Sequence, residues 1–125
     1  MLQQEERRTN RSDNIFCALE LQLAATARRA RFSSIVLTEE QGLTVASTGN
    51  AGEVEEIAAM SPQLAPGGRI WQGKIRNDDG GSRLVTVAPI QSDTSKLFIC
   101  AVGGNSSIIT SALLRGGQGV KRILS

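Results

Sequence analysis

The chain has no histidine among its 125 residues. This absence removes the side chain that most often serves as a general base or metal ligand. With only two cysteines, the chain also falls short of the ligand set of a structural zinc site. The usual Ser–His and Cys–His nucleophile pairs are therefore excluded. We expect a protein that is not an enzyme and that holds no metal and no cofactor.

Aromatic residues are scarce, with three phenylalanines, one tryptophan and no tyrosine. This scarcity disfavours a small-molecule pocket built on ring stacking. Neither sign of charge dominates, because 14 Lys and Arg face 12 Asp and Glu, and so the chain lacks the dense basic surface of nucleic-acid-binding proteins. No apolar run approaches the roughly 18 residues that cross a bilayer. We expect no nucleic-acid partner, no membrane insertion and a cytoplasmic location.

Three further features of the sequence contain groups that could take part in chemistry. Cys17 lies in an apolar helical pattern and Cys100 in the most hydrophobic strand-like run, which favours small buried side chains over reactive thiols or a disulfide. The glycine-rich segment at 116–121 has neither the spacing nor the Ser or Thr of a phosphate-binding loop. A site for nucleotide hydrolysis is therefore not predicted. Positive charge suits the carbonyl end of a helix, which favours a solvated helix end over an arginine finger at Arg28, Arg29 and Arg31.

The N-terminal third of the chain predicts a tail and a helix. Residues 1–12 are polar without apolar periodicity, and we expect a flexible tail or a frayed helical extension. Residues 13–124 then form a single domain. A helix is expected from about Asp13, acting as its N-cap, to Arg31, with one apolar face made by Phe16, Leu19, Leu23, Ala27 and Ala30.

A hairpin and a second helix are predicted next. Residues 34–38 and 43–47 read as two antiparallel strands, joined by a turn in which Gly42 supplies a positive φ. Asn50 precedes Glu53 by three residues, which resembles a capping box and predicts a helix over about 51–60. Pro62, Pro66 and the glycines at 67–68 are expected to end the helix, and its apolar face consists of Val54, Ile57 and Ala58.

Three more strands and a last helix complete the pattern. Strands are expected over 69–75, 83–90 and 96–102, with a turn at 77–81 between the first two. The third of them is apolar on both faces, as in a central strand. A helix follows from near Ser106, and glycines within 116–119 are expected to break it, because each helical glycine costs roughly 1 kcal/mol relative to alanine. The order is helix, two strands, helix, three strands, helix, an α+β arrangement.

This order, the hairpin at 36–47 and the Glu- and Ala-rich helix after it resemble the roadblock/dynein-light-chain family over about residues 13–124. The resemblance implies a five-stranded antiparallel sheet in the order two, one, five, four, three. It also implies one helix on one face of the sheet and two on the other.

The same resemblance implies a homodimer or family heterodimer, formed by pairing the third strand edge to edge and packing the second helix against its mate. The candidate interface residues are Val54, Ile57, Ala58, Met60, Ile70, Trp71, Gln72 and Lys74. An unpaired strand edge with apolar side chains is an association hazard, and dimerisation would cover it. Trp71 has an alternative reading, as a core residue or as a lid over the sheet.

Family members typically regulate or attach to small Ras-like GTPases or act as adaptors, and some bacterial ones stimulate GTP hydrolysis by their partner. The leading hypothesis is therefore a non-enzymatic dimer that binds such a GTPase. Two alternatives stay open: a small-molecule sensor of profilin-like fold, with its ligand between the sheet and the second helix, and a purely structural subunit of a larger complex. Because a fold does not determine function, the residues of the functional site must distinguish these hypotheses.

Overall fold

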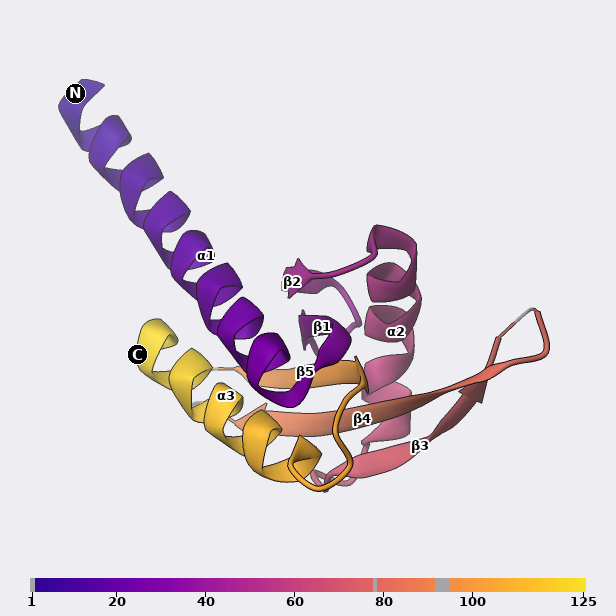
Figure 1. Ribbon diagram of the computed structural model, residues 1–125. Coiled ribbons are helices and arrows are strands. Elements are labelled where there is room, and N and C mark those ends of the chain that lie inside the picture. Colours follow the sequence, from indigo (N-terminus) through magenta and orange to yellow (C-terminus); the bar gives the residue numbers. More distant parts are fainter. Residues whose placement is uncertain (1, 78, 92–94) are drawn as a thin grey trace.

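A computed structural model describes residues 2–77, 79–91 and 95–125, with side chains from Asn14 onward. The elements follow the predicted order (Figure 1). They are α1 (Leu2–Ala30), β1 (Phe32–Glu39), β2 (Thr44–Thr48), α2 (Ala51–Leu64), β3 (Trp71–Arg76), β4 (Ser82–Gln91), β5 (Lys96–Gly103) and α3 (Ile109–Leu124). Asp78, in the predicted turn between β3 and β4, lies outside the described residues.

The five strands form one antiparallel sheet in the order β2-β1-β5-β4-β3. β5 lies at the centre and pairs with β1 and β4, and six consecutive residues of this strand are buried. In Figure 1, α1 and α3 run side by side on one face of the sheet, and α2 lies on the other. The predicted fold class and strand order are therefore confirmed.

The sheet separates two apolar clusters, as the alternation of side chains along each strand requires. On one face, Leu23 of α1 and Leu113 of α3 pack against Ile35 and Ile99 of the sheet. On the other face, Ile57 of α2 packs in a cluster with strand residues that include Phe98. Burial on both faces explains why β5 has no polar alternation.

The first helix is longer than predicted, because it begins at Leu2 and not near Asp13. Asp13 therefore lies inside the helix, and its assignment as the N-cap is wrong. Phe16 is 49% exposed and Cys17 is also exposed, contrary to the prediction that both are buried. Figure 1 shows the physical reason: the N-terminal half of α1 projects past the end of α3 and past the sheet, where no element covers it.

The second helix starts as predicted and ends later. The Asn50 side chain accepts a hydrogen bond of 3.0 Å from the Glu53 backbone N–H, which confirms the N-cap. The helix then continues through Pro62 to Leu64, four residues past the predicted end at Met60. Pro62 removes only one backbone donor, near the end of the helix. The added turn places Leu64 and Ala65 against the apolar cluster that contains Ile57 and Phe98, which we name the α2 cluster.

The predicted break in the third helix is wrong, because α3 is continuous from Ile109 to Leu124. Its glycines allow close contact with α1. A Cβ at Gly116 would lie 2.7 Å from Thr26 Oγ1, and one at Gly119 would overlap the Gln22 side chain. The intrinsic cost of glycine in a helix is therefore offset by packing that larger residues would prevent.

Candidate interaction surface

Strand β3 lies at one end of the sheet and pairs only with β4, so its outer edge is unpaired within the described structure. It begins at Trp71, one residue after the exposed Ile70, and ends at Arg76. The N–H and C=O groups along such an edge can pair with another strand. The edge that the family resemblance assigned to a dimer is therefore present and open.

The two faces of β3 differ in chemistry. Trp71 and Ile75 are half-buried and pack against the cluster beneath α2. Gln72 and Lys74 point to the opposite face and are exposed, and the Gln72 Nε2 donates a 3.0 Å hydrogen bond to Thr86 Oγ1 on β4. Buried and exposed side chains thus alternate along β3, and its apolar side is the one that continues the layer of α2.

Gly73 has a specific packing role between Trp71 and Ile75. A Cβ at Gly73 would lie 2.7 Å from Trp71 Cζ2, so the indole ring occupies the space that a larger side chain would need. This contact holds the ring along the strand. Trp71 thus serves as a partial cover over the sheet and also retains an exposed surface at its edge.

The candidate residues on α2 fall into two groups. Val54, Ile57 and Ala58 are buried in the core of their own chain. Met60 is half-buried, at the margin of the same cluster. A partner that binds along α2 and β3 would therefore contact Met60 and the β3 residues. Val54, Ile57 and Ala58 would not be accessible to it, because they are buried in the core beneath.

A polar network that the sequence pattern did not predict ties α2 to the sheet. The Glu53 carboxylate accepts hydrogen bonds from Ser34 Oγ at 2.6 Å and from Arg83 Nη1 at 3.0 Å. Arg83 Nη2 lies 2.6 Å from Glu56 Oε1. The predicted capping box is only half made, because the Glu53 side chain binds across to β1 and β4. The sequence pattern assigns Glu53 to the first turn and cap of the helix, and no sequence signal points to Arg83.

The environment of this network sets the charge state of its members. Burial raises the pKa of Glu53, but hydrogen bonds from Ser34 and Arg83 and the charge of Arg83 outweigh it and lower the pKa below its ordinary value. Burial lowers the pKa of Arg83, whereas its bonds to Glu56 and Glu53 raise it, with a net rise. Among the described residues, none accepts a hydrogen bond from the buried Arg83 Nε. Glu53 and Arg83 are therefore both charged at neutral pH.

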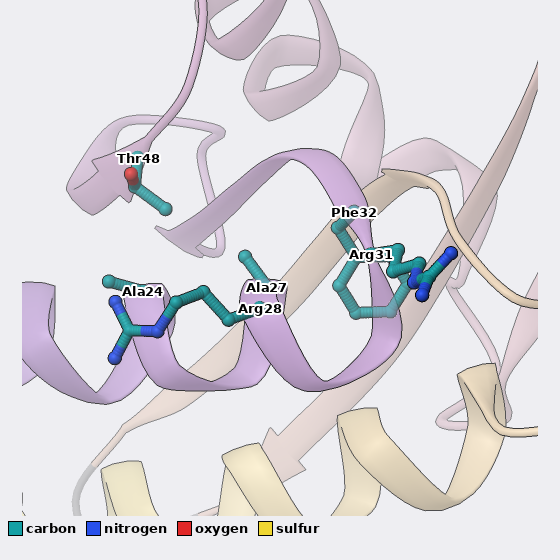
Figure 2. A pocket seen from close by; sticks show the side chains of 6 residues that line it. All are labelled: Ala24, Ala27, Arg28, Arg31, Phe32 and Thr48. Carbon is teal, nitrogen blue, oxygen red and sulfur yellow. The ribbon is translucent and has the colours of Figure 1, made fainter.

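A second surface feature lies at the opposite edge of the sheet. An open groove of about 590 Å³ separates the C-terminal part of α1 from β2, and we name it the α1–β2 groove. Figure 2 shows its lining, with the small side chains of α1 facing Thr48 and the two guanidinium groups directed away from each other. Its lining residues are Ala24, Ala27, Arg28, Arg31, Phe32 and Thr48.

Arg31 has a left-handed backbone conformation with φ 62°, which ends α1. The Asn105 N–H donates to the Ala30 carbonyl at 2.8 Å and so satisfies one of the terminal acceptors. Arg28 and Arg31, considered above as an arginine finger or a solvated helix end, are exposed. The C-terminal end of α1, which lines the groove, is therefore fixed by a hydrogen bond to the loop before α3.

Within residues 14–77, 79–91 and 95–125, no group of three or more His, Cys, Asp or Glu side chains is placed to hold a metal ion. None of the described helices is long and apolar enough to cross a membrane. Between α2 and the sheet, where a sensor ligand was considered, the described side chains form a packed apolar cluster. The surfaces described above are therefore the main candidates for function.

Comparisons with known proteins place the fold. A scan against protein-family models and a search of curated proteins gave no match. The gliding protein MglB from Thermus thermophilus superposes with a TM-score of 0.67 at 11% identity, covering 87% of this chain and 90% of that one. A structure described as MglB with a tetrameric arrangement gives 0.68 at 11% identity, with 87% and 89% covered.

A roadblock/LC7 domain from Streptomyces avermitilis gives a TM-score of 0.64 at 16% identity, covering 84% of this chain and 96% of that domain. Identities this low establish the architecture and leave residue roles open. The chain has the fold of MglB and of roadblock/LC7 domains.

Proposed function

We propose that this protein is a dimeric, non-enzymatic regulator that binds a small Ras-like GTPase. The observation that carries the proposal is the open β3 edge with a half-buried apolar margin, in a fold shared with MglB and roadblock/LC7 domains. The family resemblance of the sequence supplies the expected partner class. Any effect on GTP hydrolysis would come from contacts that order the switch loops of the GTPase.

The dimer forms by antiparallel pairing of β3 with β3 of a second copy or of a family relative. Such pairing satisfies backbone groups that are otherwise exposed at the edge. It brings together the exposed Ile70, the outer part of Trp71 and Met60 at the margin of the α2 cluster. A two-fold arrangement uses the same patch on both copies, as a C2 interface requires.

Ile70→Lys tests the dimer. Ile70 is exposed in the protomer, so the substitution leaves the core intact while it places a charge at the start of the edge strand. Sedimentation equilibrium at micromolar concentration is expected to show a dimer for the wild type and weakened association for the variant. The control is Leu114→Lys on α3, which replaces a similarly exposed leucine away from β3. A wild-type protein that is monomeric at this concentration would contradict the proposal.

The GTPase is tested by capture from a lysate of the source cells, with the wild type and Ile70→Lys as paired baits. Each bait is incubated with GDP or with a non-hydrolysable GTP analogue, and retained proteins are identified by mass spectrometry. We expect a small GTPase to be retained by the wild type in one nucleotide state and to be reduced on the variant. Its GTP hydrolysis is then measured with and without this protein. Capture of other proteins only would favour the structural subunit.

A further inference from the structure

Strand β2 forms the second edge of the sheet and pairs only with β1 within the described structure. It is five residues long, and the α1–β2 groove runs beside it. Val45 is half-buried and Thr44 is exposed, so the strand does not carry the charged side chains that commonly protect an edge. Its pairing with β1 shifts at Val45, which forms a β-bulge, and the outer backbone groups on either side of this residue make no strand pairing within the described structure.

Exposed apolar side chains gather at this edge. Leu21 is 66% exposed and Leu43 is 65% exposed, the two highest values among the large apolar side chains that the structure describes. Leu43 directly precedes β2. Leu21 precedes Ala24 and Arg28 by three and seven residues, which places all three on one face of α1 and next to the α1–β2 groove. The edge is therefore flanked by apolar surface on the helix and on the hairpin.

The surfaces beside the two ends of β2 have opposite charges. Near its C-terminal end, Arg28 and Arg31 line the groove together with Thr48. At its N-terminal end, Glu39 and Glu40 belong to the hairpin that leads into the strand. Neither arginine forms an ion pair with another residue of the described chain. The edge is thus acidic at one end and basic at the other.

We propose that a second copy of this chain pairs with β2 through a two-fold antiparallel contact centred near Ala46. Reversing the strand direction places Thr44 of one copy opposite Thr48 of the other. The acidic hairpin of each copy then lies beside the arginines of the other, so that Glu40 faces Arg28. The exposed leucines are covered in the same contact.

The choice of occupant follows from this symmetry. An isologous contact needs a surface that is complementary to itself, and an edge with opposite charges at its two ends meets that condition under an antiparallel two-fold. A foreign acidic segment would suit the arginines but would meet Glu39 and Glu40 at the other end. A second copy satisfies both ends.

This contact is separate from the β3 dimer of the proposed function. The chain has two sheet edges, so protomers joined through β3 can be joined again through β2 into larger assemblies. The test is therefore made in the Ile70→Lys background, where β3 pairing is weakened. In that background, the part of the remaining association that Leu43→Lys removes reports on β2, and a lack of such an effect leaves the proposed function untouched.

The first experiment compares Ile70→Lys, Ile70→Lys/Leu43→Lys and Ile70→Lys/Leu114→Lys by sedimentation velocity over a dilution series. Leu43 and Leu114 are both exposed leucines, so both substitutions leave the protomer core intact. We expect concentration-dependent dimers in the first and third proteins and a dissociation constant at least about tenfold higher in the second. A monomer at every concentration in all three proteins would overturn the proposal, as would equal association in the second and third.

The second experiment exchanges charge in the same background. In the symmetric contact, Arg28 of each copy faces Glu40 of the other, so a single substitution acts at two positions. Arg28→Glu brings two carboxylates together at each position, Glu40→Lys brings two cations together, and each is expected to weaken association roughly tenfold. Combining them restores opposite charges across the two-fold and is expected to return the dissociation constant to within about threefold of the starting value. Additive weakening in the double variant would overturn the pairing of Arg28 with Glu40. Circular dichroism on each variant verifies that the protomer is folded.

Discussion

The indole ring of Trp71 lies against the backbone of Gly73, the next residue on the same face of β3. A Cβ at Gly73 would come within 2.7 Å of Trp71 Cζ2, closer than side-chain carbons normally approach. The glycine therefore determines where the ring lies at the edge of the sheet. Trp71 is also the only tryptophan of the chain, so the fluorescence of the protein reports on the environment of this one ring.

Gly73→Ala is expected to displace the Trp71 ring toward solvent. We expect a red shift of the fluorescence emission and a loss of about 1–3 kcal/mol in the free energy of unfolding, measured by urea titration. Gly67→Ala is the control, because nothing lies within 4 Å of a Cβ there and its φ is not in the left-handed region. An unshifted spectrum in Gly73→Ala would show that the ring does not depend on the glycine.

Adjacent glycines of α3 are expected to respond in opposite directions to alanine. Gly116→Ala places a Cβ 2.7 Å from Thr26 Oγ1, so it separates α1 from α3 and lowers the free energy of unfolding by about 1–3 kcal/mol. Gly117→Ala meets Ile90 only at 3.4 Å, an ordinary contact. Its expected effect is a gain of up to about 1 kcal/mol from helix propensity. Thermal melts compare the two, and a gain in both would contradict the close helix contact.

The ion pair between Glu53 and Arg83 predicts a specific dependence of stability on pH. The folded pKa of Glu53 lies below its ordinary value of 4.5, so the carboxylate stabilises the fold above that pH, and the contribution is lost as the pH falls through the folded pKa. Glu53→Gln is expected to lower the free energy of unfolding by about 1 kcal/mol near neutral pH and to reduce its decline toward pH ~3.

Glu55→Gln is the control for the loss of one negative charge on the same helix, because Glu55 is exposed. Urea unfolding of both variants and of the wild type gives the comparison. The bridge carries no stability if Glu53→Gln and Glu55→Gln have the same unfolding free energy near neutral pH.

The two thiols are expected to react very differently. Burial raises the pKa of Cys100 to about 12, although a hydrogen bond with Ser61 lowers it in part, whereas Cys17 is exposed on α1. A thiol reagent at neutral pH is expected to modify Cys17 in the folded protein and Cys100 only after unfolding. Peptide mass spectrometry after a short labelling pulse distinguishes the two sites. Rapid labelling of Cys100 in the folded protein would contradict its burial.

The strands were predictable because their periodicity reflects what each face contacts. Alternation of Trp71, Gly73 and Ile75 with polar residues marks a strand with two different faces, and the unbroken apolar run of β5 marks a strand covered on both. The N-cap at Asn50 was predictable because its partner is only three residues away. Signals of this kind are local, and here they identified the elements in their correct order.

What could not be predicted depends on contacts between distant residues. The glycines at 116–119 read as a helix break because the sequence does not show that Thr26 and Gln22 lie against them. Arg83 carried no signal, because its partners on α2 are distant in sequence. Phe16 fits the apolar face of α1 by spacing, but spacing does not tell where the neighbouring elements stop. The surface at the β2 edge likewise became visible only in the structure, whereas the family resemblance had already implied the β3 edge.

The central position of β5 also has a consequence for synthesis on the ribosome. Before residues 96–103 leave the exit tunnel, the β1–β2 hairpin and the β3–β4 hairpin have no strand to join them, because β5 alone pairs with both. Each hairpin then exposes an inner edge as well as the outer edge that remains in the finished protein. The nascent chain is consequently most prone to pair with other chains just before β5 emerges, and the sheet is completed only when β5 joins the two hairpins.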